Sequence, residues 1–202
     1  MKRLICIMTI TCMALCSCTP AKESSTVQDN TNQDVLYQVA LLQSLVQGYY
    51  DGIVTVSELK QHGDTGIGTF EGVNGEMIVL DGTVYQAVAD GSITTPSDKE
   101  TVPFSNVTFF DVDKTLSLSG VADMAALQET MNGVVKELGA NCFYMVKIEG
   151  TFDSIKVRSE YKQEKPYRAL DAALAEDQTE FDYKDIRGTI VGLYCPDYMG
   201  KR

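Results

Sequence analysis

Residues 61–91 constrain the fold of this 202-residue chain more than any other segment. The segment contains seven of the chain's 16 glycines, at positions 63, 66, 68, 72, 75, 82 and 91. Three short apolar runs, 67–70, 77–80 and 83–87, lie between these glycines. The pairs Asn74-Gly75 and Asp81-Gly82 separate the runs, and such pairs accept the positive φ that tight hairpin turns require. The segment therefore predicts antiparallel strands joined by hairpins.

Glu76 is a charged residue placed directly between the Asn-Gly turn and the apolar run that comes after it. A carboxylate in this position is either a solvated turn residue or a reactive group held on a rigid support. The pattern of residues alone favours the solvated turn residue.

The remainder of the chain combines short strands with helices. A strand is expected to pass into a helix within 35–50, ending at Gly48, and further helices are predicted at 57–61 (capped by Ser57 or Thr55), 121–138 and 170–175. Strands are predicted at 107–110, 115–118, 143–148, 151–158, 181–183 and 189–195, with a hairpin turn at Glu149-Gly150 and a polar loop over 90–103. The predicted fold class is α+β, with mixed and antiparallel β-sheets and a few short helices.

Length and charge restrict the classes of partner. The length suits one compact domain, or two small ones that share a core. The formal net charge of -11 argues against nucleic acid, because nucleic-acid binding requires clustered Lys and Arg.

The N-terminus has the features of a targeting signal. Lys2-Arg3 precedes an apolar run over 4–15, which is too short to span a bilayer. The next residues, Leu15-Cys-Ser-Cys18, are similar to a bacterial lipobox, in which the cysteine is lipidated. We expect a lipoprotein signal peptide at 1–17, a lipidated Cys18, a flexible tether over 18–33 and a folded domain over 34–202. The alternative is an ordinary cleaved signal that is rich in cysteine.

We therefore expect the protein in the cell envelope, in the periplasm or at the cell surface. Only its lipid anchor would contact the membrane. Cys142 and Cys195 are then the cysteines of the mature chain. An exported protein allows them to form a disulfide. Both lie in or beside predicted strands, however, where the pattern favours buried free cysteines.

The segment 61–91 resembles the alpha-acetolactate decarboxylase family, and the likeness extends over 34–198. The residues that carry it outside 61–91 are Leu36-Tyr-Gln-Val39, Tyr50-Asp-Gly52, Pro103-Phe-Ser-Asn-Val-Thr-Phe-Phe-Asp111, Asp113-Lys-Thr115, Gly150-Thr-Phe152, Val157-Arg-Ser159, Lys162-Gln-Glu-Lys-Pro-Tyr167 and Gly188-Thr-Ile-Val-Gly192. The resemblance implies two closely joined β-rich halves, the second incomplete here, and a homodimer in the full-length family.

The resemblance also implies an activity, the carboxy-lyase reaction that converts 2-acetolactate to acetoin and carbon dioxide. A zinc ion that chelates the substrate carbonyl and hydroxyl would act as Lewis acid in the family. The family's active-site glutamate matches Glu76, and its catalytic arginine matches Arg158. Glu71 stands where the family more often has asparagine. The residues alone would instead favour Arg158 as a surface arginine paired with Glu160.

The zinc ligands implied by the resemblance are three histidines, two of them in a His-x-His pair beyond the matched segment. The 202 residues contain a single histidine, His62, next to a turn. We therefore expect no catalytic zinc and negligible decarboxylase activity from these residues alone. A likeness cut off in this way suggests a premature stop, a frameshift or an incomplete gene model. The alternatives are a non-catalytic envelope lipoprotein that uses the scaffold for binding or structure, and a fragment without function.

Overall fold

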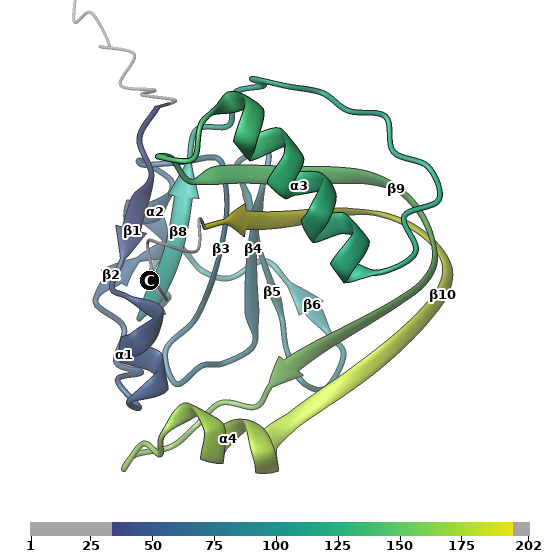
Figure 1. Ribbon diagram of the computed structural model, residues 1–202. Helices are drawn as coiled ribbons and strands as arrows, with labels where there is room; N and C mark the ends of the chain where they lie inside the picture. The colour runs from purple at the N-terminus through teal and green to yellow at the C-terminus, as the bar shows by residue number, and fades with distance from the viewer. Residues whose placement is uncertain (1–33, 196–202) are drawn as a thin grey trace, which may run out of the picture. The chain divides into compact units, whose positions relative to one another are not determined.

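The computed structural model describes residues 34–195 (Figure 1). The expected signal peptide, Cys18 and tether lie outside the described residues, as do residues 196–202. Contacts divide the chain into Met1–Asn30 and Thr31–Arg202, and all the described residues belong to the second unit. No helix within residues 34–195 has the length and apolarity that crossing a bilayer would require.

The first half of the described chain is built around one antiparallel sheet (Figure 1). Among residues 34–195 this sheet has six strands, in the order β1 (Tyr37–Val39), β8 (Phe104–Thr108), β3 (Thr65–Thr69), β4 (Glu76–Leu80), β5 (Thr83–Ala87) and β6 (Ile93–Thr94). The hairpins predicted from the glycine-rich segment are confirmed, because β3 pairs with β4 and β4 pairs with β5. Gly75 and Gly82 both adopt φ +77° in the two turns.

Four short elements complete the first half of the described chain. They are α1 (Leu42–Val46), α2 (Val56–Leu59) and a small antiparallel pair of β2 (Val54–Thr55) with β7 (Thr101–Val102). Thr55 is the N-cap of α2, since its Oγ1 accepts a hydrogen bond from the Glu58 amide at 3.2 Å. The polar loop predicted over 90–103 is partly wrong, because β6 and β7 form within it.

The sheet buries one face in an apolar core. Strand alternation sends Met77 and Val79 into the core and leaves Glu76 and Ile78 on the opposite face. The buried members of the core are Val39, Val56, Leu59, Phe70, Met77, Val79, Val84, Val102 and Val107. At Gly66 an added Cβ would lie 2.2 Å from the backbone oxygen of Asn106 on β8. This glycine therefore serves the close approach of two strands and not a turn.

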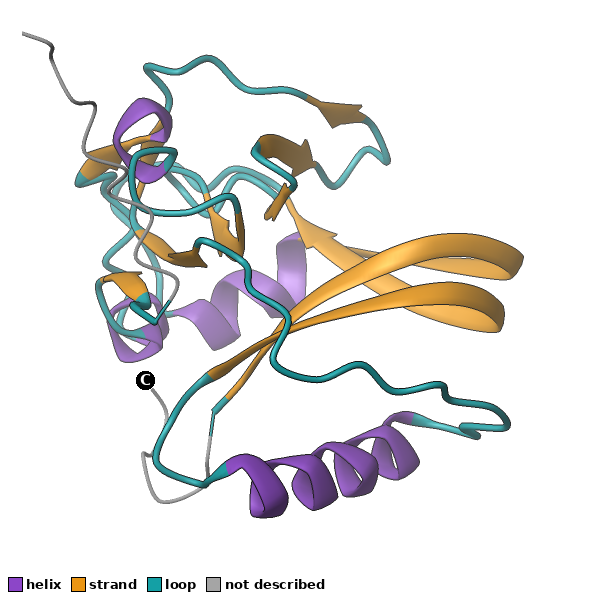
Figure 2. Cartoon of the chain, turned by 90° about the horizontal axis from the view of Figure 1, so that it is seen from above, coloured by secondary structure: helices purple, strands orange, loops and turns teal. Residues whose placement is uncertain are grey.

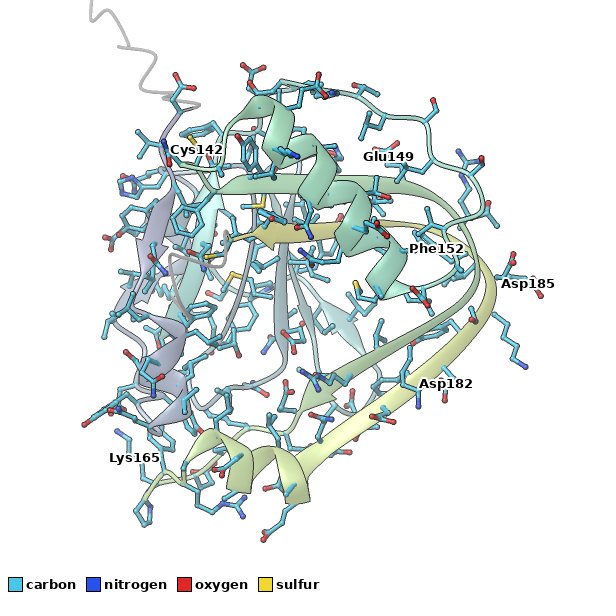
Figure 3. All side chains as sticks on the ribbon, in the orientation of Figure 1. Cys142, Glu149, Phe152, Lys165, Asp182 and Asp185 are labelled. Atoms are coloured by element: carbon cyan, nitrogen blue, oxygen red, sulfur yellow. The ribbon has the colours of Figure 1, made fainter. Side chains whose placement is uncertain are left out.

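The second half of the described chain is dominated by one long hairpin of β9 (Tyr144–Glu160) and β10 (Gln178–Tyr194). The predicted turn at Glu149-Gly150 is wrong, because Gly150 lies inside β9 and pairs with Gly188. The reversal occurs instead through α4 (Leu170–Asp177) and the segment before it. Both strands curve strongly at Phe152 and Asp185, where Asp185 adopts φ 51° (Figure 3). The strands predicted separately at 181–183 and 189–195 are likewise parts of β10.

Helix α3 (Met124–Leu138) confirms the helix predicted from apolar spacing, with a later start. Asp123 caps it, since its Oδ1 accepts a hydrogen bond from the Ala126 amide at 2.9 Å. The strand predicted at 115–118 is wrong, because these residues belong to a long loop that runs alongside α3 (Figure 2). A cavity of about 800 Å³ is lined by this loop, by α3 and by β9. Among the described residues of α3, only Val135 is buried.

Candidate active site

The turn before β4 presents Glu76 at a fixed position. Glu76 is the first residue of β4 and pairs with Thr69 on one side and Ala87 on the other. The hydroxyl of Thr69 donates a hydrogen bond to the Gly75 carbonyl at 2.7 Å. The side-chain amide of Gln86 donates one to the Asn74 carbonyl at 2.8 Å. These bonds hold the turn on both sides, so that the Glu76 backbone has little freedom.

The end of β9 docks against this turn. The Gly75 amide donates a hydrogen bond to the Glu160 carbonyl at 3.1 Å, and the Ser159 hydroxyl donates to the Ala87 carbonyl at 2.7 Å. Ser159 and Glu160 are buried, whereas Arg158 is exposed. Because side chains alternate along a strand, Arg158 and Glu160 point to the same side of β9. The two segments thereby bring two carboxyl groups and a guanidinium together.

The carboxyl groups of Glu76 and Glu160 influence each other's titration. Burial raises the pKa of Glu76 to about 8, with a further contribution from the negative charge and hydrogen bond of Glu160, while Arg158 opposes the shift. Burial also raises the pKa of Glu160, and the hydrogen bond from Glu76 and the charge of Arg158 lower it. Near neutral pH Glu76 therefore retains its proton.

Comparison with known proteins decides which family these residues belong to. A family model described as alpha-acetolactate decarboxylase matches residues 36–201. The chain belongs to the alpha-acetolactate decarboxylase family. This decarboxylase-family chain is 42% identical to the alpha-acetolactate decarboxylase of Methanosarcina mazei over 170 residues, which cover 84% of the chain and 58% of that relative. It is 38% identical to the Bacillus licheniformis enzyme over 167 residues, covering 83% of the chain and 65% of the enzyme.

Solved structures support the same fold. The acetolactate decarboxylase of Bacillus subtilis strain 168 superposes with a TM-score of 0.77 at 35% identity, over 82% of this chain and 70% of that structure. A Staphylococcus aureus protein, described as being of unknown function and similar to alpha-acetolactate decarboxylase, gives a TM-score of 0.75 at the same identity and coverage. The predicted α+β class is thus confirmed. The chain spans about six-tenths of the length of the curated relatives named above.

The two site residues inferred from the family resemblance lie together in this decarboxylase fold. Glu76 of the sheet and Arg158 of the hairpin interact electrostatically although they come from different halves of the described chain. The arginine interacts with both carboxyl groups, so it is not simply the surface partner of Glu160. Glu71 is engaged elsewhere, since it accepts a hydrogen bond from the Thr101 hydroxyl at 2.6 Å.

Glu160 is the residue at this site to which the sequence alone gives no active-site role. Its position two residues after Arg158 on a strand is the one available signal, because such residues share a side. The sequence offers no sign that this side faces Glu76, since the contact depends on how the hairpin docks on the sheet.

The described residues do not fit the zinc-ligand set that the family resemblance implies. Within residues 34–195, no group of three or more His, Cys, Asp or Glu side chains is arranged to hold a metal ion. His62 stacks on Tyr37, with ring centroids 3.9 Å apart and planes 8° from parallel. Cys142 is exposed and Cys195 partly exposed, and no disulfide joins them.

Proposed function

We propose that this chain belongs to a protein that converts 2-acetolactate to acetoin and carbon dioxide, with Glu76 and Arg158 as active-site groups. Family membership supports the reaction class. The observation that carries the proposal is the placement of a neutral, partly buried Glu76 within the electrostatic reach of an exposed Arg158. An acid and a cation side by side suit an anionic substrate that must gain a proton.

The chemistry assigns a task to each residue. 2-Acetolactate is an anion, and Arg158 attracts its carboxylate and the negative charge that develops on an oxygen during the reaction. When the bond to the carboxylate breaks, its electron pair moves into the adjacent carbonyl and forms an enediolate. Glu76 then gives its proton to the carbon that lost carbon dioxide. A neutral Glu76 has the further advantage that it does not repel the incoming anion.

We further propose that the 202 residues alone have negligible activity. In the family, zinc is implied as the Lewis acid that withdraws electrons from the substrate, and this chain has one histidine in place of the three that the resemblance implies. Residues 34–195 contain no ligand group that would substitute for them.

One set of assays tests both proposals. Acetoin is measured for the 202-residue chain and for a fusion of this chain to the part of the Methanosarcina mazei relative that lies beyond the matched region, each with added zinc. We expect activity from the fusion and none from the shorter chain. In the fusion, Arg158→Ala should reduce kcat about 100-fold or more. The matched control is Lys156→Ala, an exposed cation two residues away on β9 that pairs with Glu180, and it should leave the rate unchanged.

Two results would contradict these proposals. Acetoin formation by the 202-residue chain at the rate of the fusion would refute its inactivity. A folded, zinc-loaded fusion that makes no acetoin, under conditions in which the relative does, would refute the decarboxylase function and favour a non-catalytic scaffold.

We also propose that the protein is a lipoprotein of the cell envelope, anchored through Cys18. The support is the lipobox-like Leu15-Cys-Ser-Cys18 after a short apolar run. Cys18→Ser should abolish incorporation of labelled fatty acid and release the protein from the membrane fraction. Cys16→Ser, two residues earlier, is the matched control and should change neither. Retention of the label in Cys18→Ser would contradict the anchor.

Finally, we propose that the protein forms a homodimer, as the family resemblance implies. Light scattering of the fusion protein tests this, and a monomeric mass at micromolar concentration would contradict it.

A further inference from the structure

We propose that Gln163 is a positioning residue, which fixes the end of β9 that carries Arg158 against the turn that presents Glu76. Gln163 lies in the connection of residues 161–169 between β9 and α4 (Figure 1). Its contacts are a property of the folded chain and stand without the proposed reaction. Their consequence for catalysis rests on the proposed function.

The chain from Glu160 to Gln163 contacts the turn before β4 at two points. The Gln163 amide donates a hydrogen bond to the Gly72 carbonyl at 2.7 Å, and the Gly75 amide donates one to the Glu160 carbonyl at 3.1 Å. Gly72 adopts φ +75°, and a Cβ added to it would lie 2.8 Å from the Gln163 carbonyl oxygen. The two segments therefore meet backbone to backbone, with no room for a side chain at Gly72.

The side chain of Gln163 is buried, and each of its polar groups is bonded. Only 6% of the residue is exposed. Its Nε2 donates hydrogen bonds to the Tyr161 carbonyl at 3.0 Å and to the Asp177 carboxylate at 3.1 Å. Its Oε1 accepts one from the Arg168 guanidinium at 2.8 Å. A buried amide bonded in this way has one favoured orientation, because any other would leave a polar atom unpaired.

Asp177 extends this network to β10. It is the last residue of α4, and its carbonyl accepts a hydrogen bond from the Tyr161 amide at 2.9 Å. Its carboxylate also accepts one from the Arg168 guanidinium. Asp177 directly precedes β10, whose first residue, Gln178, lies opposite Glu160 of β9. Through these bonds, Gln163 joins the end of β9, the start of β10 and the turn before β4.

Arg158 depends on this arrangement for its position. Its side chain is exposed, so the backbone of β9 determines where the guanidinium lies relative to Glu76. Loss of the Gln163 side chain would allow the end of β9 to move away from the turn. A displacement of about 1 Å at a reacting group lowers a rate by up to about 100-fold. Gln163 need not touch the substrate, because it acts through Arg158.

A double-mutant cycle in the active fusion tests the proposal. Gln163→Ala should lower kcat about tenfold or more, because Arg158 is no longer held beside Glu76. In the Arg158→Ala background, the same change should lower kcat less than about twofold, because the group that Gln163 positions is already gone. Val39→Ala, in the sheet core on β1 and three strands away from β4, controls for a loss of stability alone and should leave kcat unchanged.

Three results of this cycle would overturn the proposal. One is an unchanged kcat in folded Gln163→Ala. Another is an equal loss in both backgrounds, since Gln163 would then act independently of Arg158. The third is a loss in Val39→Ala as large as that in Gln163→Ala, since lower stability alone would then explain the effect.

A charge exchange covers the case in which Gln163→Ala does not fold. Gln163→Glu loses both donors and places a second carboxylate beside Asp177, so it should also lower kcat. Adding Asp177→Asn returns a donor to this contact and leaves one carboxylate for Arg168. The double variant should recover kcat to within about threefold of the unmodified fusion. A double variant no more active than Gln163→Glu would overturn the proposal.

Hydrogen exchange of the unmodified 202-residue chain provides a readout that does not depend on acetoin formation, so a failure of the proposed reaction remains distinguishable. The amides of Gly75 and Gln163 make the two bonds between the segments. They should be exposed in the same opening event, with protection factors within about threefold of each other. A Gln163 amide that exchanges at least about tenfold faster than the Gly75 amide would overturn the proposal.

Discussion

The sheet over residues 37–108 and the helix and hairpin over 124–194 differ in how well their apolar residues are buried. In the first region, Phe70 and Tyr50 are fully buried, and the core strands contribute side chains that are at most 3% exposed. In the second region, Met124 is 74% exposed, and the apolar residues of α3 and β9 line the large cavity. The first region therefore has a well-buried core of its own, whereas most apolar residues of α3 and β9 are only partly buried.

The candidate active-site residues lie where the two regions meet. The hairpin contributes Arg158 and Glu160 from the end of β9, and that end is bonded to the turn and strand that present Glu76. The sheet holds the turn that presents Glu76, and the hairpin completes the site with the docked end of β9. Farther along β9, Lys147 pairs with Asp81 of the β4–β5 turn at 2.8 Å. Four experiments test this difference, and the largest effect is expected in the core of the sheet.

Phe70→Ala should reduce the free energy of unfolding by about 3–5 kcal/mol, because it leaves a cavity in the sheet core. Met124→Ala, at an exposed position of the second region, should change it by less than about 0.5 kcal/mol. Urea denaturation of both variants measures the difference. Equal losses would show that the two regions are packed alike.

Two glycine substitutions, each within a strand of one region, test the same difference in packing. Gly66→Ala should destabilise the chain by about 1–3 kcal/mol, since the new Cβ would clash with the backbone oxygen of Asn106. Gly150→Ala should instead stabilise it by about 0.4–1 kcal/mol, because no atom lies within 4 Å of an added Cβ and the unfolded chain loses freedom. Thermal unfolding of the pair provides the test, and a destabilising Gly150→Ala would mean that the hairpin is tightly packed at this position.

The pH dependence of the stability of Glu76→Gln tests the place where the two regions meet. The pKa of Glu76 is raised on folding to about 8, so between its ordinary value and pH 8 the native state binds more protons than the unfolded state. The contribution of Glu76 to stability therefore falls as the pH rises through this window. Relative to the unmodified chain, Glu76→Gln should gain about 1–3 kcal/mol on going from pH 5 to pH 9. Chemical denaturation at the two pH values measures this, with Glu180→Gln as a control that should show no such trend.

The smallest effect is expected at the cap of α3. Asp123→Ala removes the acceptor for the Ala126 amide and should cost about 1 kcal/mol, confined largely to the helix. Hydrogen exchange of the α3 amides should accelerate, while exchange in β3 and β4 should not. Acceleration in the sheet as well would show that helix and sheet unfold as one unit.

The sequence predicts best where the signal is local. The Asp81-Gly82 turn and the apolar runs beside it indicate β4 and β5 directly, and apolar spacing indicates α3. The same logic fails at Glu149-Gly150, where a glycine within a long strand resembles a turn. Gly150 pairs with Gly188 of the distant strand β10, and a short window of sequence carries no information about such pairing.

The site is predictable only in part for the same reason. Glu76 and Arg158 are inferred from family resemblance, and by pattern alone both are ordinary surface residues. Glu160 gains its place only when the hairpin docks on the turn at Gly75. Likewise, the sequence around Gly66 does not indicate that this glycine allows the backbone of β8 to approach closely.

Native-state hydrogen exchange of the 202-residue chain tests most directly the claim that a well-buried sheet carries the site while the less buried hairpin contributes its docked end. Amides of β3, β4 and β8, and the Gly75 amide that bonds to Glu160, should exchange only on global unfolding. Amides of β9 between Tyr144 and Phe152 should exchange at least about tenfold faster, through openings that leave the sheet intact. Uniform protection across both regions, or a Gly75 amide that exchanges as fast as the middle of the hairpin, would contradict the account.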